Sequence, residues 1–284
     1  LATLQPSTMR STLLRLIFLA APFNLLLAQS PDAVHFSGIL VDTHNDFPTA
    51  SIQKHVSLDA NLKGVTHTDL ARLFAGGVDV QVFSIFCDGQ QVQPYVWARR
   101  EIDSVETWAR RNPKQLTILH SSKELYQSVK AGKIGAFMGV EGGHMIENRL
   151  DYLDTFFAHG VRYMTLTWNN STNWATSALD ETTQSNLPHK GLTDFGKSVI
   201  SKMNQLGMLV DLSHVGEQTF WDALSVTTNP VIASHSSVYA LCPHRRNLKD
   251  DQIRAIGKNG GVIHLNFFAG FLDSTYQDKS TRFT

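Results

Sequence analysis

Five residues of the kinds that bind transition metals stand at the ends of apolar segments of this chain. They are His44, Asp46, Glu141, His214 and His235. Imidazole nitrogens and carboxylate oxygens are ligands that suit a borderline divalent ion such as zinc. One carboxylate of such a set can bridge two ions, so the set fits two metals better than one. The residue types therefore predict a binuclear metal site.

The segments that carry these residues have the composition of buried β-strands. GILVDTHND supplies the first two ligands, KIGAFMGVE the third, MLVDLSHV the fourth and PVIASHSS the fifth. A β/α barrel presents its active site in this way, because side chains converge from the C-terminal ends of separate parallel strands. His44 and Asp46 are two residues apart, so on a strand they point to the same face.

Strand-like and helix-like segments alternate along the chain. We expect strands over residues 38–46, 78–86, 133–141, 161–168, 208–215, 229–237 and 261–268. We expect helices over 67–77, 97–112, 122–133, 150–160, 193–207, 216–227 and 247–260, with Thr66, Thr68 and Ser122 as candidates to begin two of them. A long polar loop over 169–191 is expected to serve the active site, because long structureless loops in compact domains are usually functional.

This alternation implies parallel strands joined by right-handed crossovers. The expected fold class is α/β, a (β/α)8 TIM-like barrel of the metal-dependent hydrolase type. Only seven strands can be counted, so the barrel is expected to be truncated before its eighth strand. The length of 284 residues agrees with one barrel, which typically needs ~250 residues.

Composition excludes some classes of partner. The chain has 25 Lys and Arg against 25 Asp and Glu and shows no basic stripe, so a nucleic-acid partner is not expected. Its only two cysteines, Cys87 and Cys242, do not make a disulfide framework and are expected to be free thiols.

Residues 1–28 have the pattern of a signal peptide that begins at Met9. A basic start is followed by the apolar stretch LIFLAAPFNLLL and by an acceptable cleavage site that ends at Ala28. The apolar stretch is short for a membrane span of ~20 residues, so no stable span is expected. Residues 29–284 would then form one exported domain, periplasmic or secreted. The alternative is an uncleaved N-terminal membrane anchor.

Longer motifs resemble the membrane (renal-type) dipeptidase family of zinc peptidases. They are VDTHNDFP, GVEGGH, VRYMTLTWNN, LVDLSHV and, most specifically, SHSSVYALCPHRRNLKDDQI. The resemblance runs from about residue 38 to residue 268. It implies a β/α barrel that holds two zinc ions and hydrolyses the peptide bond of dipeptides through a metal-bridged hydroxide. A homodimer is also considered.

The resemblance also implies roles for individual residues. His44 and Asp46 would bind one zinc ion, His214 and His235 the other, and Glu141 would bridge them. Arg246 would hold the C-terminal carboxylate of the substrate, since an arginine fork binds a carboxylate through two parallel hydrogen bonds. Arg245 is the competing candidate for that role.

The chain departs from the family pattern in two places. The family usually has a histidine that steadies the reacting carbonyl after the fourth expected strand, and this chain has Trp168 there. Trp168 would therefore line the substrate site, and Asn169 or Asn170 could supply the missing donor. The family's proton-transferring aspartate belongs to the eighth strand, which would lie beyond Thr284. No catalytic acid or base is therefore assigned, and the chain alone is expected to be inactive by this interpretation.

Two other functions remain open at this point. The first is another binuclear amidohydrolase, of the lactonase or deaminase type. Those enzymes generally begin with His-x-His on the first strand, and Asp46 in the third position favours the dipeptidase. The second is a non-catalytic zinc-binding relative, which Trp168 supports and the complete set of five ligands opposes.

Overall fold

Eight parallel strands form one sheet in the computed structural model of the protein, which describes residues 30–276. The candidate signal peptide lies outside these residues. The strands are β1 (Val41–Asn45), β2 (Val80–Phe86), β3 (Leu116–Ile118), β4 (Ile134–Glu141), β5 (Val161–Thr165), β6 (Leu209–Asp211), β7 (Ile232–Ala233) and β8 (Val262–Ile263). Their order in the sheet is β1-β2-β4-β5-β6-β7-β8, with β3 paired to β4 outside this path.

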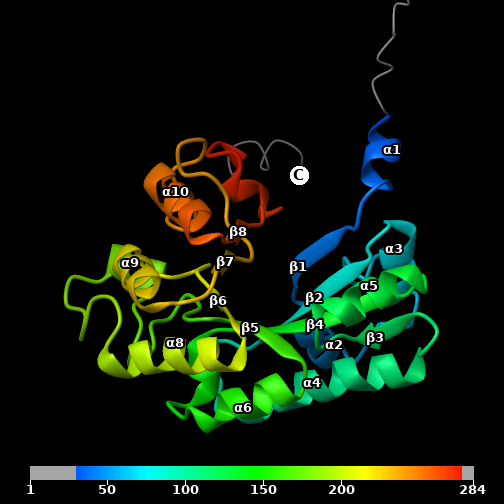
Figure 1. Ribbon diagram of the computed structural model, residues 1–284, viewed down its shortest axis with the longest axis horizontal. Helices are drawn as coiled ribbons and strands as arrows, with labels where there is room; N and C mark the ends of the chain where they lie inside the picture. The colour runs from blue at the N-terminus through cyan, green and yellow to red at the C-terminus, as the bar shows by residue number, and fades with distance from the viewer. Residues whose placement is uncertain (1–29, 277–284) are drawn as a thin grey trace, which may run out of the picture.

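The sheet curls so that β1 and β8 lie at its two ends, as Figure 1 shows. Within residues 30–276, no pairing joins β1 to β8. The expected fold class, a parallel α/β sheet of the TIM-barrel type that does not close, is therefore confirmed. The seven strands expected from the sequence are the seven strands of the path.

The sequence-based count missed β3. This strand has only three residues and pairs with the first residues of β4, from Leu116 opposite Ile134 to Ile118 opposite Ala136. The later residues of β4 pair with β5 instead, from Met138 to Glu141. Because β2 takes the other edge of β4, β3 and β5 share one edge in succession. An apolar run this short carries no strand periodicity, so the sequence gives no signal for it.

Helices connect the strands and cover the outside of the sheet (Figure 1). They are α1 (Pro31–His35), α2 (Phe47–Lys54), α3 (Leu70–Ala75), α4 (Pro94–Arg111), α5 (Ser122–Lys130), α6 (Asp151–Ala158), α7 (Ala178–Thr183), α8 (Asp194–Leu206), α9 (Glu217–Val226) and α10 (Asp250–Asn259), with short 3-10 turns η1 (Gly143–Ile146) and η2 (Ala269–Phe271). All seven expected helices are present, and α1, α2 and α7 were not expected. The loop over 169–191 is therefore not structureless, because α7 lies within it.

Two of the expected helix starts were wrong. Asp69, rather than Thr66 or Thr68, precedes α3 and accepts a hydrogen bond from the backbone nitrogen of Arg72. Ser121, one residue before Ser122, precedes α5 and accepts a hydrogen bond from the backbone nitrogen of Glu124. In both cases the capping side chain lies three residues before the amide that it satisfies, which is the usual geometry of an N-cap.

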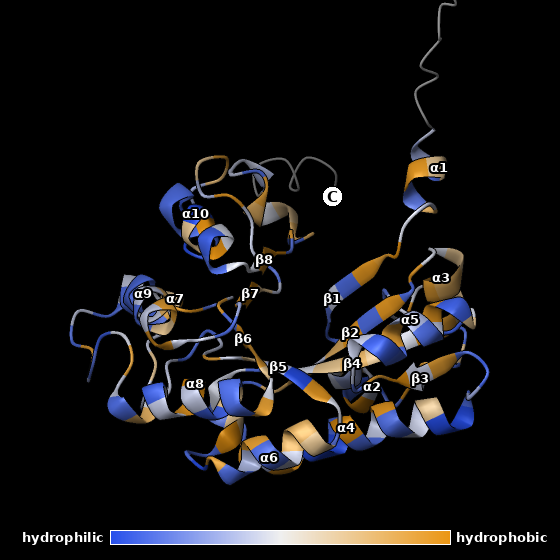
Figure 2. Ribbon diagram, viewed as in Figure 1, coloured by the Kyte–Doolittle hydropathy of each residue, from blue (hydrophilic) through white to orange (hydrophobic). Residues whose placement is uncertain are grey.

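The core lies between the sheet and these helices. On α4, Ile102, Val105 and Trp108 recur at helical spacing and are fully or almost fully buried. Figure 2 shows the result as alternating hydrophilic and hydrophobic bands along α4 and α8. Cys87 and Cys242 are buried free thiols, as expected. In the described part of the chain, no helix is both long and apolar enough to cross a membrane.

Candidate metal centre and substrate cavity

The five candidate ligands meet at one end of the sheet, where the strands end. His44 belongs to β1, and Asp46 directly follows that strand. Glu141 is the last residue of β4, whereas His214 and His235 follow β6 and β7 by three and two residues. Residues separated by up to 191 positions are thus brought together because parallel strands deliver their C-terminal ends to the same rim.

Glu141 lies at the centre of this group and divides its two oxygens between the others. Its Oε2 lies 3.4 Å from Nε2 of His44. Its Oε1 lies 2.9 Å from Nε2 of His214 and 3.3 Å from Nε2 of His235. His44 is in turn 3.3 Å from Oδ1 of Asp46. All five side chains therefore form one continuous cluster, with Glu141 between two sets of ligands.

Asp46 is the one exposed member of the cluster. The side chains of His44, His214, His235 and Glu141 are almost completely buried, whereas that of Asp46 is 59% exposed. His214 also has a backbone φ of 66°, in the left-handed region that residues other than glycine seldom adopt. Its carbonyl accepts a hydrogen bond from the backbone of Ala178, which helps to hold this conformation.

Burial and the neighbouring charges set the protonation of the cluster. Burial lowers the pKa of His214 to about 3 and that of His235 to about 4, so both imidazoles are neutral at ordinary pH. Burial opposes ionisation of Glu141, but His44, His214 and His235 more than offset it and hold its pKa well below the ordinary value. Burial also opposes a charge on His44, yet the surrounding oxygens of Tyr163, Glu141 and Asp46 hold its pKa well above the ordinary value.

These side chains have the chemistry of a metal centre. Nε2 of His214 and Nε2 of His235 lie 3.1 Å apart, beside the same carboxylate oxygen. Two ligands that bind one tetrahedral zinc ion at about 2.1 Å are themselves roughly 3.4 Å apart. One ligand atom from each of His44, Glu141 and His235 lies within 4.8 Å of the others. The donor set and its spacing therefore fit metal ions at this position.

A cavity of about 1280 Å³ opens over the cluster. Its lining includes four residues that the sequence offered as candidates for the substrate site: Trp168, Asn169, Arg245 and Arg246. Trp168 packs against Phe86 with 4.9 Å between ring centroids. Of the two arginines, Arg246 is 6% exposed and Arg245 is exposed. The buried Arg246 donates a hydrogen bond to the carbonyl of His235, so it lies directly beside the cluster.

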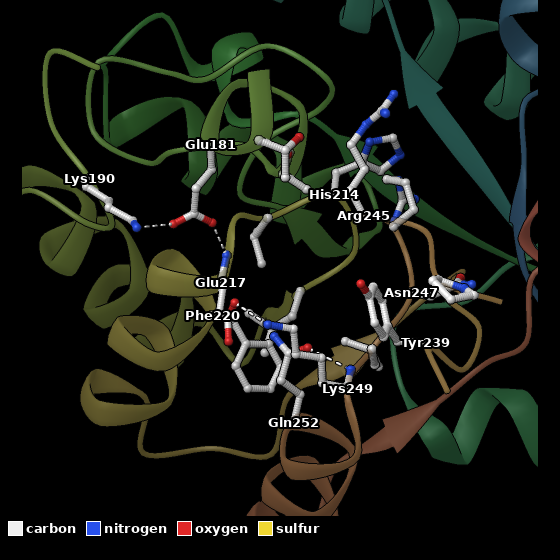
Figure 3. A pocket seen from close by; sticks show the side chains of 17 residues that line it. Glu181, Lys190, His214, Glu217, Phe220, Tyr239, Arg245, Asn247, Lys249 and Gln252 are labelled. Atoms are coloured by element: carbon white, nitrogen blue, oxygen red, sulfur yellow. Dashed lines mark hydrogen bonds and ion pairs between the residues drawn. The ribbon is translucent and has the colours of Figure 1, made fainter. Parts of the chain in front are cut away.

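A second cavity, of about 420 Å³, shares His214, Arg245 and Arg246 with the first. Figure 3 shows this second cavity, whose lining includes the ion pairs of Lys190 with Glu181 and of Lys249 with Glu217. None of the other four candidate ligands lines it. The larger cavity is therefore the one that gives a substrate access to the cluster.

Sequence reasoning missed two side chains that contact the ligands and a third that contacts one of these two. Tyr163 on β5 contacts His44, Ser234 contacts His235, and Asp211 on β6 contacts Ser234. Asp211 is the one polar residue of β6, which was the available signal for it. A buried polar group needs a partner, so its position in such a segment points to a network.

Comparison with known proteins shows the family of the chain. The model of the membrane dipeptidase family, peptidase family M19, matches residues 29–282. A protein of Schizosaccharomyces pombe, described as an uncharacterised dipeptidase, is 36% identical over 260 residues, which are 85% of this chain and 62% of that protein. The chain thus spans less than two thirds of the length of this curated relative.

Solved structures have the same fold. A metallopeptidase from Rhodobacter sphaeroides, liganded with a phosphinate mimic of the dipeptide L-Ala-D-Ala, is 24% identical with a TM-score of 0.75, over 82% of this chain and 75% of that one. The dipeptidase AC, a metallopeptidase of family M19, is 25% identical with a TM-score of 0.75, over 83% and 74%. The family match covers most of the chain, and the chain belongs to the membrane dipeptidase family.

Proposed function

We propose that this protein is a zinc-dependent dipeptidase that binds two zinc ions. His44 and Asp46 would hold one ion, His214 and His235 the other, and Glu141 would bridge them. The position of Glu141 carries this proposal, because its two oxygens face different sets of ligands. A carboxylate so placed can serve two ions at once.

When bound, a zinc pair lowers the pKa of water to give a nucleophile at neutral pH and polarises the peptide carbonyl. The protein's own residues would bind and orient the substrate. Arg246 would receive the substrate carboxylate, since its Nη1 is buried and has no hydrogen-bond partner among the described residues. Such an unpaired buried donor is costly, and a carboxylate would satisfy it.

Trp168 would form one wall of the substrate site. Its ring lies 6.4 Å from that of His214 and packs on Phe86, so it narrows the cavity beside the cluster. An indole can donate one hydrogen bond but cannot act as an imidazole does. We assign proton transfer to no residue between 30 and 276.

Substrate selection tests this proposal. The zinc-loaded protein, purified from its native cells, should hydrolyse unblocked dipeptides and should be poor on the same dipeptides with an amidated C-terminus. A lactone and an aminopurine nucleoside serve as substrates for the competing amidohydrolase reactions. Turnover of either of these without turnover of dipeptides would reject the dipeptidase. Zinc binding with no turnover of any substrate would favour a non-catalytic relative.

We further propose that residues 1–28 direct export, that residues 29–284 form the dipeptidase domain, and that the protein forms a homodimer. N-terminal sequencing of the protein from its native cells distinguishes removal of the leader from an uncleaved anchor. Sedimentation analysis gives the oligomeric state.

A further inference from the structure

We propose that two separate hydrogen-bond relays position His44 and His235 as metal ligands. The first relay runs from His44 to Tyr163. The second runs from His235 through Ser234 to Asp211. The inference rests on the two-metal function proposed above and names the residues that prepare its ligands. Each relay keeps a proton on Nδ1 of its histidine, so Nε2 is the ring nitrogen that a metal would bind.

The first relay follows from the single proton of the Tyr163 hydroxyl. That oxygen lies 3.0 Å from the backbone carbonyl of Thr43 and 3.0 Å from Nδ1 of His44. A carbonyl only accepts hydrogen bonds, so Tyr163 donates its proton to Thr43. The Tyr163 oxygen is then left to accept from His44. Nδ1 of His44 therefore carries a hydrogen, while Nε2 faces Glu141 and Asp46.

The second relay begins at Asp211, which is completely buried and receives four hydrogen bonds. The backbone nitrogens of Ser213 and Ser234 donate to Oδ1 over 3.1 and 2.8 Å. The hydroxyls of Thr165 and Ser234 donate to Oδ2, each over 2.6 Å. A carboxylate has about four acceptor positions, and donors fill all of them. Asp211 therefore acts as an ionised acceptor and gives no proton to its neighbours.

Ser234 connects Asp211 to His235 through its hydroxyl group. Its only hydroxyl proton is given to Asp211, so its oxygen accepts from Nδ1 of His235, 2.8 Å away. Nε2 of His235 is then without a proton and lies 3.3 Å from Oε1 of Glu141. A bare nitrogen and a carboxylate oxygen repel each other at this distance, and a cation between them would remove the repulsion.

The two relays share no residue, and each ends on a ligand of a different proposed metal. His214, the remaining imidazole, has no partner for Nδ1 in the described part of the chain. Each metal would therefore have one imidazole ligand whose ring is held by a hydrogen bond at Nδ1. Loss of one relay should weaken one metal and leave the other almost unchanged.

Zinc competition with a chelator tests the relays on the full chain. Tyr163→Phe and Ser234→Ala should each raise one of the two zinc dissociation constants about 10–100-fold, which is the usual effect of removing a group behind a ligand. The double variant should raise both constants by the same factors, because effects at independent sites add. Ser128→Ala is the matched control, since Ser128 is a buried serine on α5 that donates to the carbonyl of Lys133, away from the cluster.

Thermal unfolding of the metal-free variants separates positioning from folding. We expect the metal-free variants to unfold near the wild-type temperature, and Ser234→Thr, which keeps the hydroxyl, to recover zinc affinity. Nitrogen NMR of histidine in the zinc-loaded protein should show a proton on Nδ1 of His235 that Asp211→Asn disturbs.

A wild-type protein that binds no zinc would contradict the proposed function itself. A wild type that binds two zinc ions, with both relay variants binding equally well, would overturn the relays alone. Equal weakening of both ions by either single variant would also overturn them.

Discussion

Glu141 is a single residue on which both halves of the proposed metal centre depend. Its Oε2 faces His44, and its Oε1 faces His214 and His235. Replacing it by glutamine removes a charge from both positions while it keeps the shape of the side chain. Replacing one histidine removes a ligand from one position only. The two kinds of change should therefore give different patterns of metal loss.

We expect Glu141→Gln to lower zinc occupancy at both positions and His235→Ala to empty mainly one. Elemental analysis of the purified proteins after dialysis gives the number of zinc ions per chain. The control is Ser128→Ala, which should retain the wild-type content. If both variants lose one ion each, Glu141 binds a single metal and the bridging role is wrong.

Arg246 should determine the preference for a free carboxylate. A charge-assisted hydrogen bond contributes about 1.5–3 kcal/mol, so Arg246→Ala should lower kcat/KM for a dipeptide by roughly 10–150-fold. Arg246→Lys should recover little, because an ammonium group lacks the two-pronged geometry of guanidinium. The exposed Arg245 provides the matched control, and Arg245→Ala should have a much smaller effect. The measurement is steady-state kinetics on a dipeptide and on its amide.

The alternative assignments would give a different pattern. Equal cleavage of the dipeptide and its amide by the wild type would show that carboxylate binding does not select the substrate. A larger loss in Arg245→Ala than in Arg246→Ala would move the role to Arg245.

At the scale of elements, the packing of β4 against β5 decides where the first relay lies. Gly139 on β4 has no side chain, and Tyr163 of β5 occupies the space instead. A Cβ atom added at Gly139 would lie 2.0 Å from Cζ of Tyr163, which is impossible without displacement of the ring. The absence of a side chain at Gly139 thus allows the tyrosine hydroxyl to reach His44.

Gly139→Ala should therefore destabilise the protein by about 1–3 kcal/mol, the usual cost of overpacking a core. It should also weaken zinc binding, because displacement of Tyr163 breaks its contact with His44. Gly257→Ala is the control: Gly257 lies within α10 and an added Cβ meets nothing within 4 Å. That change should stabilise the protein by about 0.5–1 kcal/mol. The measurement is urea unfolding of both variants. Equal free energies of unfolding for the two variants would contradict the role of Gly139.

Glu101 joins three elements behind the cluster. This fully buried carboxyl on α4 accepts hydrogen bonds from Thr49 of α2 and from the backbone nitrogen of Phe86 at the end of β2. The indole of Trp97 donates to it as well. Burial raises the pKa of Glu101 to about 8, although these three donors oppose the rise.

The raised pKa of Glu101 gives a stability that depends on pH. Between its ordinary value of 4.5 and about 8, the folded protein keeps a proton that the unfolded chain has released. The contribution of Glu101 to stability is therefore greatest at low pH and falls as the pH rises through this range, by at most about 1.4 kcal/mol per pH unit. Glu101→Gln should remove this dependence. We expect urea unfolding to show that the stability of the variant relative to wild type increases from pH 5 to pH 8. If the free energies of unfolding of the two proteins change in parallel with pH, Glu101 is not the source of the dependence.

At the scale of the whole molecule, exposed apolar side chains gather where the two ends of the sheet path lie. Leu265, Phe267 and Phe268 follow β8 and are 65, 91 and 52% exposed. Ile39 and Val41, at the start of β1, are 42 and 38% exposed. Four of these five side chains line the larger cavity. Apolar surface beside an unpaired strand edge favours association between molecules.

The double substitution of Leu265→Lys and Phe267→Ser should therefore slow the self-association of the full chain at high concentration. The measurement is light scattering at matched protein concentrations over several hours. Val92 is 78% exposed and lies between β2 and α4, so Val92→Ser is the control for removal of an apolar side chain elsewhere. An equal effect of the control would show that this region has no special part in association.

The sequence alone determined the fold class and the identity of the candidate ligands. Alternation of strand and helix segments requires parallel strands, and a ligand at the end of each strand must then reach the common rim. For this reason His44, Asp46, Glu141, His214 and His235 could be named without a structure. The family resemblance added Arg246 and Trp168, both of which line the cavity over the cluster.

Only the tertiary structure decided how these side chains are supported. Whether Tyr163 reaches His44 depends on the missing side chain of Gly139, and no local pattern encodes a contact between residues 119 positions apart. The same holds for the contact of Asp211 with Ser234, which depends on the pairing of β6 with β7. The short β3 escaped detection because three residues carry no periodicity, whereas its pairing with β4 is visible at once in the folded sheet. Local composition gives the segments and their ends, but contacts across the sheet arise from register, which the whole set of strands determines together.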